Sequence, residues 1–185
     1  MAWARQALRL PDADVLEAAI NEIQPDAHGM TVLPTFAGER SPGYAEDIRA
    51  TLHGLSLDTS PIDIVRALME GIAMRLATIC DALRDGGIAQ AGALLAASGG
   101  ALQASPAWCQ MIADAAGVPL EVSDKPEATS RGAALLATGY WLKEMQPIAN
   151  SQSLIYHPNP QHHSIYRAAM ARQQELYAKL VRSDR

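Results

Sequence analysis

ALLAASGGALQASPAWCQMIADAAG, residues 93–117, is the stretch that decides the fold of this chain. An apolar run ends at Gly99 and Gly100, and an apolar helical pattern opens after Ser105 and Pro106. Glycines let the main chain approach a ligand that any Cβ would push away, and the N–H groups and dipole of a following helix favour anions. The order of strand, turn and helix therefore predicts a phosphate or nucleotide cradle. A Gly-Gly turn is also common between a strand and a helix where no ligand binds.

Residues 60–87 carry the most regular helical pattern in the chain. Ser60, Pro61 and Asp63 supply a cap, a preset first turn and a carboxylate at the positive end of the helix dipole. Apolar residues then recur at three- and four-residue steps as far as Asp85-Gly86-Gly87. We expect one long helix here.

Strand and helix patterns alternate over most of the remaining sequence. Alternation of this kind predicts an α/β layer with a parallel component. The segments MTVLPTF and ATLHGLSL are expected to pair as strands across a loop rich in glycine and proline. Other strands are expected at 92–98 and 118–122, and helices at 3–9, 13–23, 105–116 and 128–143.

The C-terminal part of the chain has a different composition. Residues 146–163 are rich in Pro, Ser, Asn, Gln and His, which is typical of a linker. A polar helical pattern follows over 164–185. We therefore expect a domain over 1–145, a linker over 146–163 and a C-terminal helix.

Composition narrows the class of protein and its partners. The net charge is −5 and the basic residues are scattered, so nucleic acid is not an expected partner. Cys80 and Cys109 lie in helical patterns without CxxC spacing, which predicts buried, reduced thiols and neither a disulfide nor a metal site. Apolar runs stay well short of the roughly 20 residues that span a bilayer, and no signal-type core follows Met1, so we expect a cytoplasmic protein with no membrane partner.

Four blocks of this sequence, in this order and spacing, resemble the C-terminal half of FGGY-family carbohydrate kinases. The blocks are LPTFAGERSPG, ATLHGLSLDTSP with its long helix, SGGALQASPAWCQMIADAAGVPLEV and EATSRGAALLA. Within the family, GERSPG and EATSRGAA look most like gluconokinase or xylulokinase-type members. The resemblance covers about residues 3–143 and implies an RNase H-like second domain of the actin and hexokinase-like ATPase superfamily.

The resemblance also implies a nucleotide site and an activity. Family members use ATP and Mg²⁺ and transfer the γ-phosphoryl group to a sugar or sugar-acid hydroxyl. Where some relatives have a polar side chain beside the nucleotide this chain has alanine, so the implied contacts there are those of the backbone. The implied nucleotide-binding residues are Ser98, Gly99, Gly100, Ala101, Gln103 and Ala104.

Family features that the sequence lacks shape the functional hypothesis. The DxGT-type phosphate motif and the catalytic aspartate of the family's first domain are not found, so no catalytic residue is assigned to this chain. The first strands of the second domain are expected before Met1, and Trp3-Ala4-Arg5 resembles the end of a family block. Phosphoryl transfer needs in-line positioning of the reactants, a metal ion that neutralises charge and an oriented nucleophile, all at the same time. We therefore expect this chain to be one half of a kinase, which takes a sugar substrate only together with an N-terminal domain. Exposed sheet edges predict self-association or a covering partner chain.

Several polar residues have two interpretations. Glu39 and Arg40 could reach the cleft or the other domain, or form a solvated turn with a local ion pair. Arg131 at a helix start needs an anionic partner, which Asp124 or Glu127 could supply. The small residues Gly132, Ala133 and Ala134 that follow are expected to pack closely on the sheet.

The remaining candidates are expected to be structural. Trp108 is expected to pack in the core and Asp114 to lie on an exposed helix face. Histidines 157, 162 and 163 straddle two prolines with no carboxylate near in sequence, which predicts solvated side chains and no metal. No acid–base role is assigned to Asp63, Asp81 and Asp85, because they are expected at helix ends or on polar faces.

Two other functions stay open beside the kinase half. One is a non-catalytic interaction module or pseudoenzyme remnant in which the glycine turn is only structural. The other is a chaperone-like ATPase of the same superfamily, for which no segment here is long enough to form a peptide-binding domain.

Overall fold

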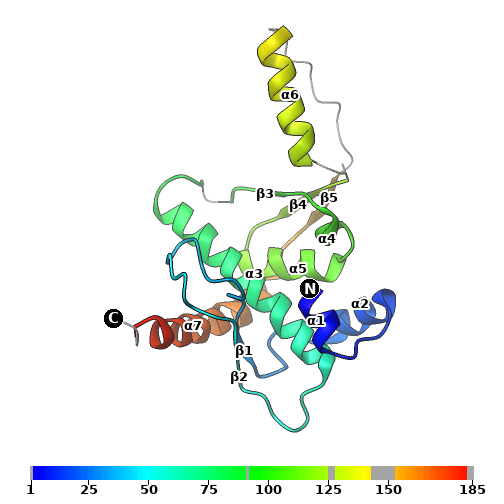
Figure 1. Cartoon of the computed structure of the whole chain (residues 1–185), viewed down its shortest axis with the longest axis vertical. Helices are drawn as coiled ribbons and strands as arrows, with labels where there is room; N and C mark the ends of the chain where they lie inside the picture. The colour runs from blue at the N-terminus through cyan, green and yellow to red at the C-terminus, as the bar shows by residue number, and fades with distance from the viewer. Residues whose placement is uncertain (1, 91, 125–127, 143–152, 183–185) are drawn as a thin grey trace.

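A computed structural model describes residues 2–90, 92–124, 128–142 and 153–182 of the 185. Helices and strands follow each other in the order expected for an α/β protein (Figure 1). The helices are α1 (Ala2–Ala7), α2 (Ala13–Glu22), α3 (Pro61–Asp85), α4 (Gly100–Gln103), α5 (Pro106–Ala116), α6 (Ala128–Leu142) and α7 (Pro160–Arg182). The strands are β1 (Thr31–Leu33), β2 (Thr51–His53), β3 (Leu95–Ala97), β4 (Leu120–Ser123) and β5 (Ser153–Tyr156).

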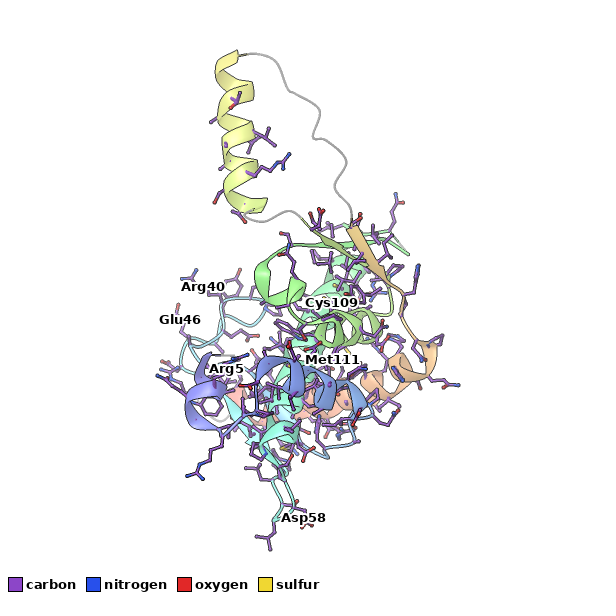
Figure 2. The ribbon with its side chains drawn as sticks, turned by 90° about the vertical axis from the view of Figure 1, so that its right-hand side faces the viewer. Arg5, Arg40, Glu46, Asp58, Cys109 and Met111 are labelled. Atoms are coloured by element: carbon purple, nitrogen blue, oxygen red, sulfur yellow. The ribbon has the colours of Figure 1, made fainter. Side chains whose placement is uncertain are left out.

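The long helix α3 is the centre of the molecule. Ser60 Oγ accepts a hydrogen bond from the Asp63 backbone N–H (3.1 Å), and Asp63 Oδ2 accepts one from the Ser60 N–H (2.9 Å). This reciprocal capping box confirms the predicted helix start. The helix packs against α5, α2, α7 and β1, and side chains of α5 such as Cys109 and Met111 lie in the interior (Figure 2).

The strands form two separate sheets. Strands β1 and β2 pair antiparallel from Thr31↔His53 to Leu33↔Thr51, which confirms the predicted pairing. The second sheet has the order β3-β4-β5, with β3 parallel and β5 antiparallel to β4. The parallel component is therefore confirmed. Helix α5 packs on the side of this sheet that faces the rest of the molecule (Figure 1).

The structure corrects the predicted linker in the part that it describes. Residues 153–156 form β5 and residues 160–163 are the first turn of α7; residues 146–152 lie outside the described residues. Asn159 Oδ1 accepts hydrogen bonds from the N–H groups of Gln161 (2.9 Å) and His162 (3.4 Å). An asparagine cap followed by Pro160 is a helix-start signal that the polar composition masked.

Helix α6 lies apart from the sheet on which its small residues were expected to pack. It projects from the rest of the molecule (Figure 1), and a Cβ built on Gly132 meets no atom within 4 Å. Leu136 is 74% exposed. In the conformation described here, the expectation of close packing is therefore wrong.

No helix in the described ranges is both long and apolar enough to cross a membrane.

Candidate functional site

The predicted unit of strand, glycine turn and helix is present at the end of β3. Gly99 has φ 126° and ψ 148°, a backbone conformation that side-chain-bearing residues rarely adopt. The short helix α4, which was not expected, begins at Gly100 and leads through Ala104 to α5. The glycine turn is thus a geometric requirement of this connection.

The backbone of the glycine turn is open to solvent. A Cβ built on Gly99 or Gly100 meets no atom within 4 Å, so neither glycine is needed for packing. The six residues predicted to contact a nucleotide lie together here, and all of them are exposed: Ser98, Gly99, Gly100, Ala101, Gln103 and Ala104. Nucleotide binding by these residues stays a prediction.

The N-terminus of α5 is occupied by a carboxylate of the protein itself. The Ala107 N–H donates to Glu17 Oε1 (2.8 Å), and Ser105 Oγ donates to Glu17 Oε2 (2.7 Å). Since Glu17 neutralises the positive end of the α5 dipole, the expectation that this helix offers free N–H groups to an anionic ligand is wrong. Among the described residues of this connection, the turn and α4 remain for that purpose. Glu17 lies on α2, far away in sequence, and no local pattern identifies it.

Gln103 ties the turn to the neighbouring strand. Its Nε2 donates a hydrogen bond to the Ser123 carbonyl oxygen at the end of β4 (2.8 Å). The turn therefore sits at the carboxyl ends of the parallel strands β3 and β4. In open α/β sheets, ligands bind at this edge.

Trp108 lies behind the turn on α5. It packs against the core and its Nε1 donates to the Met69 carbonyl (3.2 Å), which confirms the predicted core role.

Glu39 and Arg40 point in different directions. Glu39 is only 6% exposed and forms an ion pair with Arg75 and a hydrogen bond with the Tyr177 hydroxyl. The Arg75 guanidinium lies 5.1 Å from the centre of the Tyr177 ring, and burial lowers the pKa of Arg75. Glu39 thus anchors its loop to α3 and α7. Arg40 is exposed at the outside of the loop (Figure 2) and remains available to a ligand or partner.

Asp114 was expected on an exposed face but is 2% exposed. Its carboxylate accepts hydrogen bonds from Gln110 Nε2, the Asn159 N–H and His162 Nδ1, each at 2.8 Å. His163 Nδ1 donates to the Asp114 carbonyl oxygen at 2.8 Å. The expectation of solvated histidines without a carboxylate nearby is therefore wrong for His162 and His163, because α7 packs on α5 and brings them together.

The described part of the chain also contains a group of metal-ligand type that the sequence did not indicate: Asp26, His28 and Glu70, with ligand atoms within 4.8 Å of one another. Glu70 Oε1 accepts from Arg66 Nε (2.5 Å) and the Tyr166 hydroxyl (3.2 Å). Glu70 Oε2 accepts from the Asp26 N–H and from His28 Nε2, both at 3.1 Å. Both carboxylate oxygens are therefore engaged, as expected of a structural network.

The other two members of this group are engaged as well. His28 Nδ1 accepts from the Met30 N–H at 3.0 Å, so Nε2 carries the proton donated to Glu70. The Asp26 carboxylate accepts from Arg172 at 2.5 and 2.6 Å. Burial raises the pKa of Glu70, but the hydrogen bond from His28 and the charge of Arg66 outweigh it and leave that pKa lowered.

The remaining candidates take structural positions. Asp63 caps α3, and Asp81 forms ion pairs with Arg84 and Arg167. Both cysteines are free thiols, and burial raises the pKa of each. Arg131 is exposed on α6, and Glu127 lies outside the described residues.

The sequence matches a family model over residues 1–140, described as the C-terminal domain of the FGGY family of carbohydrate kinases. The chain belongs to this family. A curated relative, the glycerol kinase of Stenotrophomonas maltophilia (strain R551-3), is 33% identical over 180 residues, which are 95% of this chain and 34% of the relative. This chain thus spans about a third of that relative's length.

Solved FGGY kinases share the fold. The xylulose kinase from Rhodospirillum rubrum is 26% identical with a TM-score of 0.73, over 90% of this chain and 34% of its own. The xyloylose kinase from Brucella ovis is 25% identical with a TM-score of 0.76, over 90% of this chain and 35% of its own. The FGGY chain therefore has the α/β architecture of actin and hexokinase-like ATPases.

Proposed function

We propose that this chain holds the nucleotide-binding half of an ATP-dependent sugar kinase. One observation carries the proposal: the glycine turn at residues 98–101 presents bare, exposed backbone at the carboxyl ends of β3 and β4. Membership of a carbohydrate kinase family supports the proposal, since these kinases must hold a nucleotide beside the acceptor. The φ of 126° explains why residue 99 is glycine, but neither a positive φ nor a close contact explains why residue 100 is glycine too.

The residues of the turn would bind rather than react. Backbone N–H groups of the turn and α4 can donate to the nucleotide, while Gln103 is already bonded to Ser123 and fixes the position of α4. Because Glu17 fills the start of α5, the turn is the part of this connection that can take a ligand. Ala104 offers no polar side chain, so contacts there are those of the main chain.

Phosphoryl transfer requires further groups. Mg²⁺ would be carried on the ATP phosphates and would neutralise their charge, and we assign it no ligand among the described residues. The group that accepts the hydroxyl proton would belong to the two thirds of the relatives' length that this sequence does not match. The chain alone is therefore expected to bind nucleotide without turning over a sugar.

The acceptor is a hydroxyl of a polyol, sugar or sugar acid. The relatives above are named for glycerol and for xylulose, and the sequence blocks resembled gluconokinase and xylulokinase types. Residues 1–145 together with β5 and α7 would form one RNase H-like domain, because both of these elements pack on it.

Calorimetric titration with ADP and Mg²⁺ tests the proposal. Gly100 lies at the start of α4 with open space beside it, so Gly100→Trp fills the cradle without straining a positive φ. We expect wild type to bind ADP and Gly100→Trp to weaken binding by about tenfold or more, or about 1.4 kcal/mol. Leu57→Trp, on the exposed loop after β2, is the matched control and should bind like wild type. Equal binding by wild type and Gly100→Trp would refute the assigned site, and absence of binding would favour the interaction module.

A further inference from the structure

A cavity of about 340 Å³ lies between the loop that joins β1 to β2 and the end of α7. Its walls are residues 43–48 of the loop, with Leu180 and Val181 of the helix. This volume falls within the range of small-molecule sites, which is roughly 300–1,000 Å³. The end of α7 and the glycine turn before α4 lie at opposite sides of the view in Figure 1. The cavity is therefore separate from the proposed nucleotide site.

The loop wall of the cavity is fixed by contacts within the protein. Arg49 Nη1 donates to the backbone carbonyl oxygens of Glu46 (2.9 Å) and Ile48 (3.0 Å), which closes the loop on itself. Gly43 lies directly against α7, because a Cβ built there would collide with the Tyr177 hydroxyl. A wall that is already formed lowers the cost of ordering that binding would otherwise carry.

The loop side of the cavity is acidic. Glu46 and Asp47 are exposed, and neither carboxylate forms an ion pair with another described residue. Arg49, the nearest basic residue in sequence, is held by main-chain carbonyl oxygens instead. The described residues that line the cavity include no Lys, Arg or His. Two carboxylates without a counter-charge in the lining favour a cation over an anion or a neutral ligand.

The rest of the lining is apolar or aromatic. Ile48 and Val181 are half-buried, and Leu180 is 38% exposed, so aliphatic surface remains accessible at the helix. Tyr44, which is 77% exposed, adds an aromatic ring at the loop. Aliphatic surface packs against hydrocarbon chains, and the face of an aromatic ring attracts cationic groups. The ligand that fits both parts of the lining is a cation with a hydrocarbon portion.

We propose that this cavity is a second binding site, for a small organic cation. A guanidinium or ammonium group lies beside the carboxylates of Glu46 and Asp47, and its hydrocarbon chain packs on Leu180 and Val181. A guanidinium suits the loop side best, because its planar fork of N–H donors matches the geometry of a carboxylate.

Nuclear magnetic resonance of the isotope-labelled full chain, without nucleotide, tests the proposal with butylguanidinium as the probe. We expect saturable shifts in the amide signals of residues 43–48 and none in the glycine turn. Butylurea has the same shape without the charge, so it should bind at least about threefold more weakly. Added salt should weaken the binding of butylguanidinium alone. Shifts that do not saturate, or equal affinity for the two compounds, would overturn the proposal.

Variants test the two parts of the lining separately. Glu46→Gln with Asp47→Asn should weaken butylguanidinium binding by about three- to tenfold and change butylurea binding by less than about twofold. Glu22→Gln with Asp58→Asn is the control, because it removes the same charge at exposed positions elsewhere, and Figure 2 shows Asp58 far from Glu46. Leu180→Ser removes apolar surface and should weaken the binding of both compounds.

The control pair decides whether the site or the overall charge is responsible. The control should bind butylguanidinium like wild type, and circular dichroism checks that every variant is folded. Equal weakening by the two double replacements would overturn the site, because the net charge alone would then account for binding. Binding indifferent to Leu180→Ser would overturn the assigned apolar wall. These readouts involve no nucleotide, so their failure is separate from failure of the proposed function.

Discussion

Replacing Glu70 by glutamine is expected to lower the free energy of unfolding by about 3–5 kcal/mol, because it leaves a buried guanidinium without its counter-charge. Glu70 is 0% exposed, and Arg66 beside it is also buried. The carboxylate accepts four hydrogen bonds, from Arg66, Tyr166, His28 and the Asp26 backbone. A glutamine keeps the shape but replaces one acceptor oxygen by an NH₂ group, which faces donors.

Urea unfolding followed by circular dichroism at pH 7 measures this loss. Glu22→Gln, at an exposed position at the end of α2, is the control and should change stability by less than about 0.5 kcal/mol. A double replacement of Arg66 and Glu70 by methionine should cost less than Glu70→Met alone, because no unpaired charge remains. A loss below about 1 kcal/mol for Glu70→Gln would refute the reasoning, since that is the value of an ordinary hydrogen bond.

The same network predicts a pH dependence. The pKa of Glu70 is lowered in the folded protein, so its stabilising effect is present above the unfolded-state pKa of about 4.3 and is lost as the pH falls through the lower folded-state value. The difference in stability between wild type and Glu70→Gln should therefore be constant near neutrality and shrink in acid below about pH 4. A difference that stays constant through the acid range would contradict the assigned ionisation.

Two further predictions concern the glycine turn and its surroundings. Gly99→Ala should lower the free energy of unfolding by about 1–3 kcal/mol, because φ is 126° there, whereas Gly100→Ala should change it by less than about 1 kcal/mol; equal urea midpoints would contradict the turn geometry. Glu17→Gln should cost about 0.5–2 kcal/mol in thermal unfolding, because it weakens the cap on α5, and an effect no larger than that of Glu22→Gln would argue against the cap.

Local signals in the sequence predicted much of the fold. The start of α3, the pairing of β1 with β2 and the parallel pair β3 and β4 all follow from caps, proline, glycine and short apolar runs. Strand β5 could not be found this way, because its polar surroundings resemble a linker and its ladder depends on β4. The asparagine cap before Pro160 was a usable signal for the start of α7.

The sequence by itself determined where the glycine turn lies and which family of kinases the chain resembles, because both depend on residue types at short spacing. Only the tertiary structure decided which polar side chains already have a partner within the protein. Glu17 accepts a hydrogen bond at the start of α5, Glu39 forms an ion pair with Arg75, and Asp114 contacts His162. Each pair joins residues far apart in the chain, and hydrogen bonds and ion pairs depend on distance in space. The glycines predicted the open backbone at the end of β3. The start of α5 beside it is occupied by Glu17 because α2 packs against α5, which the sequence did not indicate.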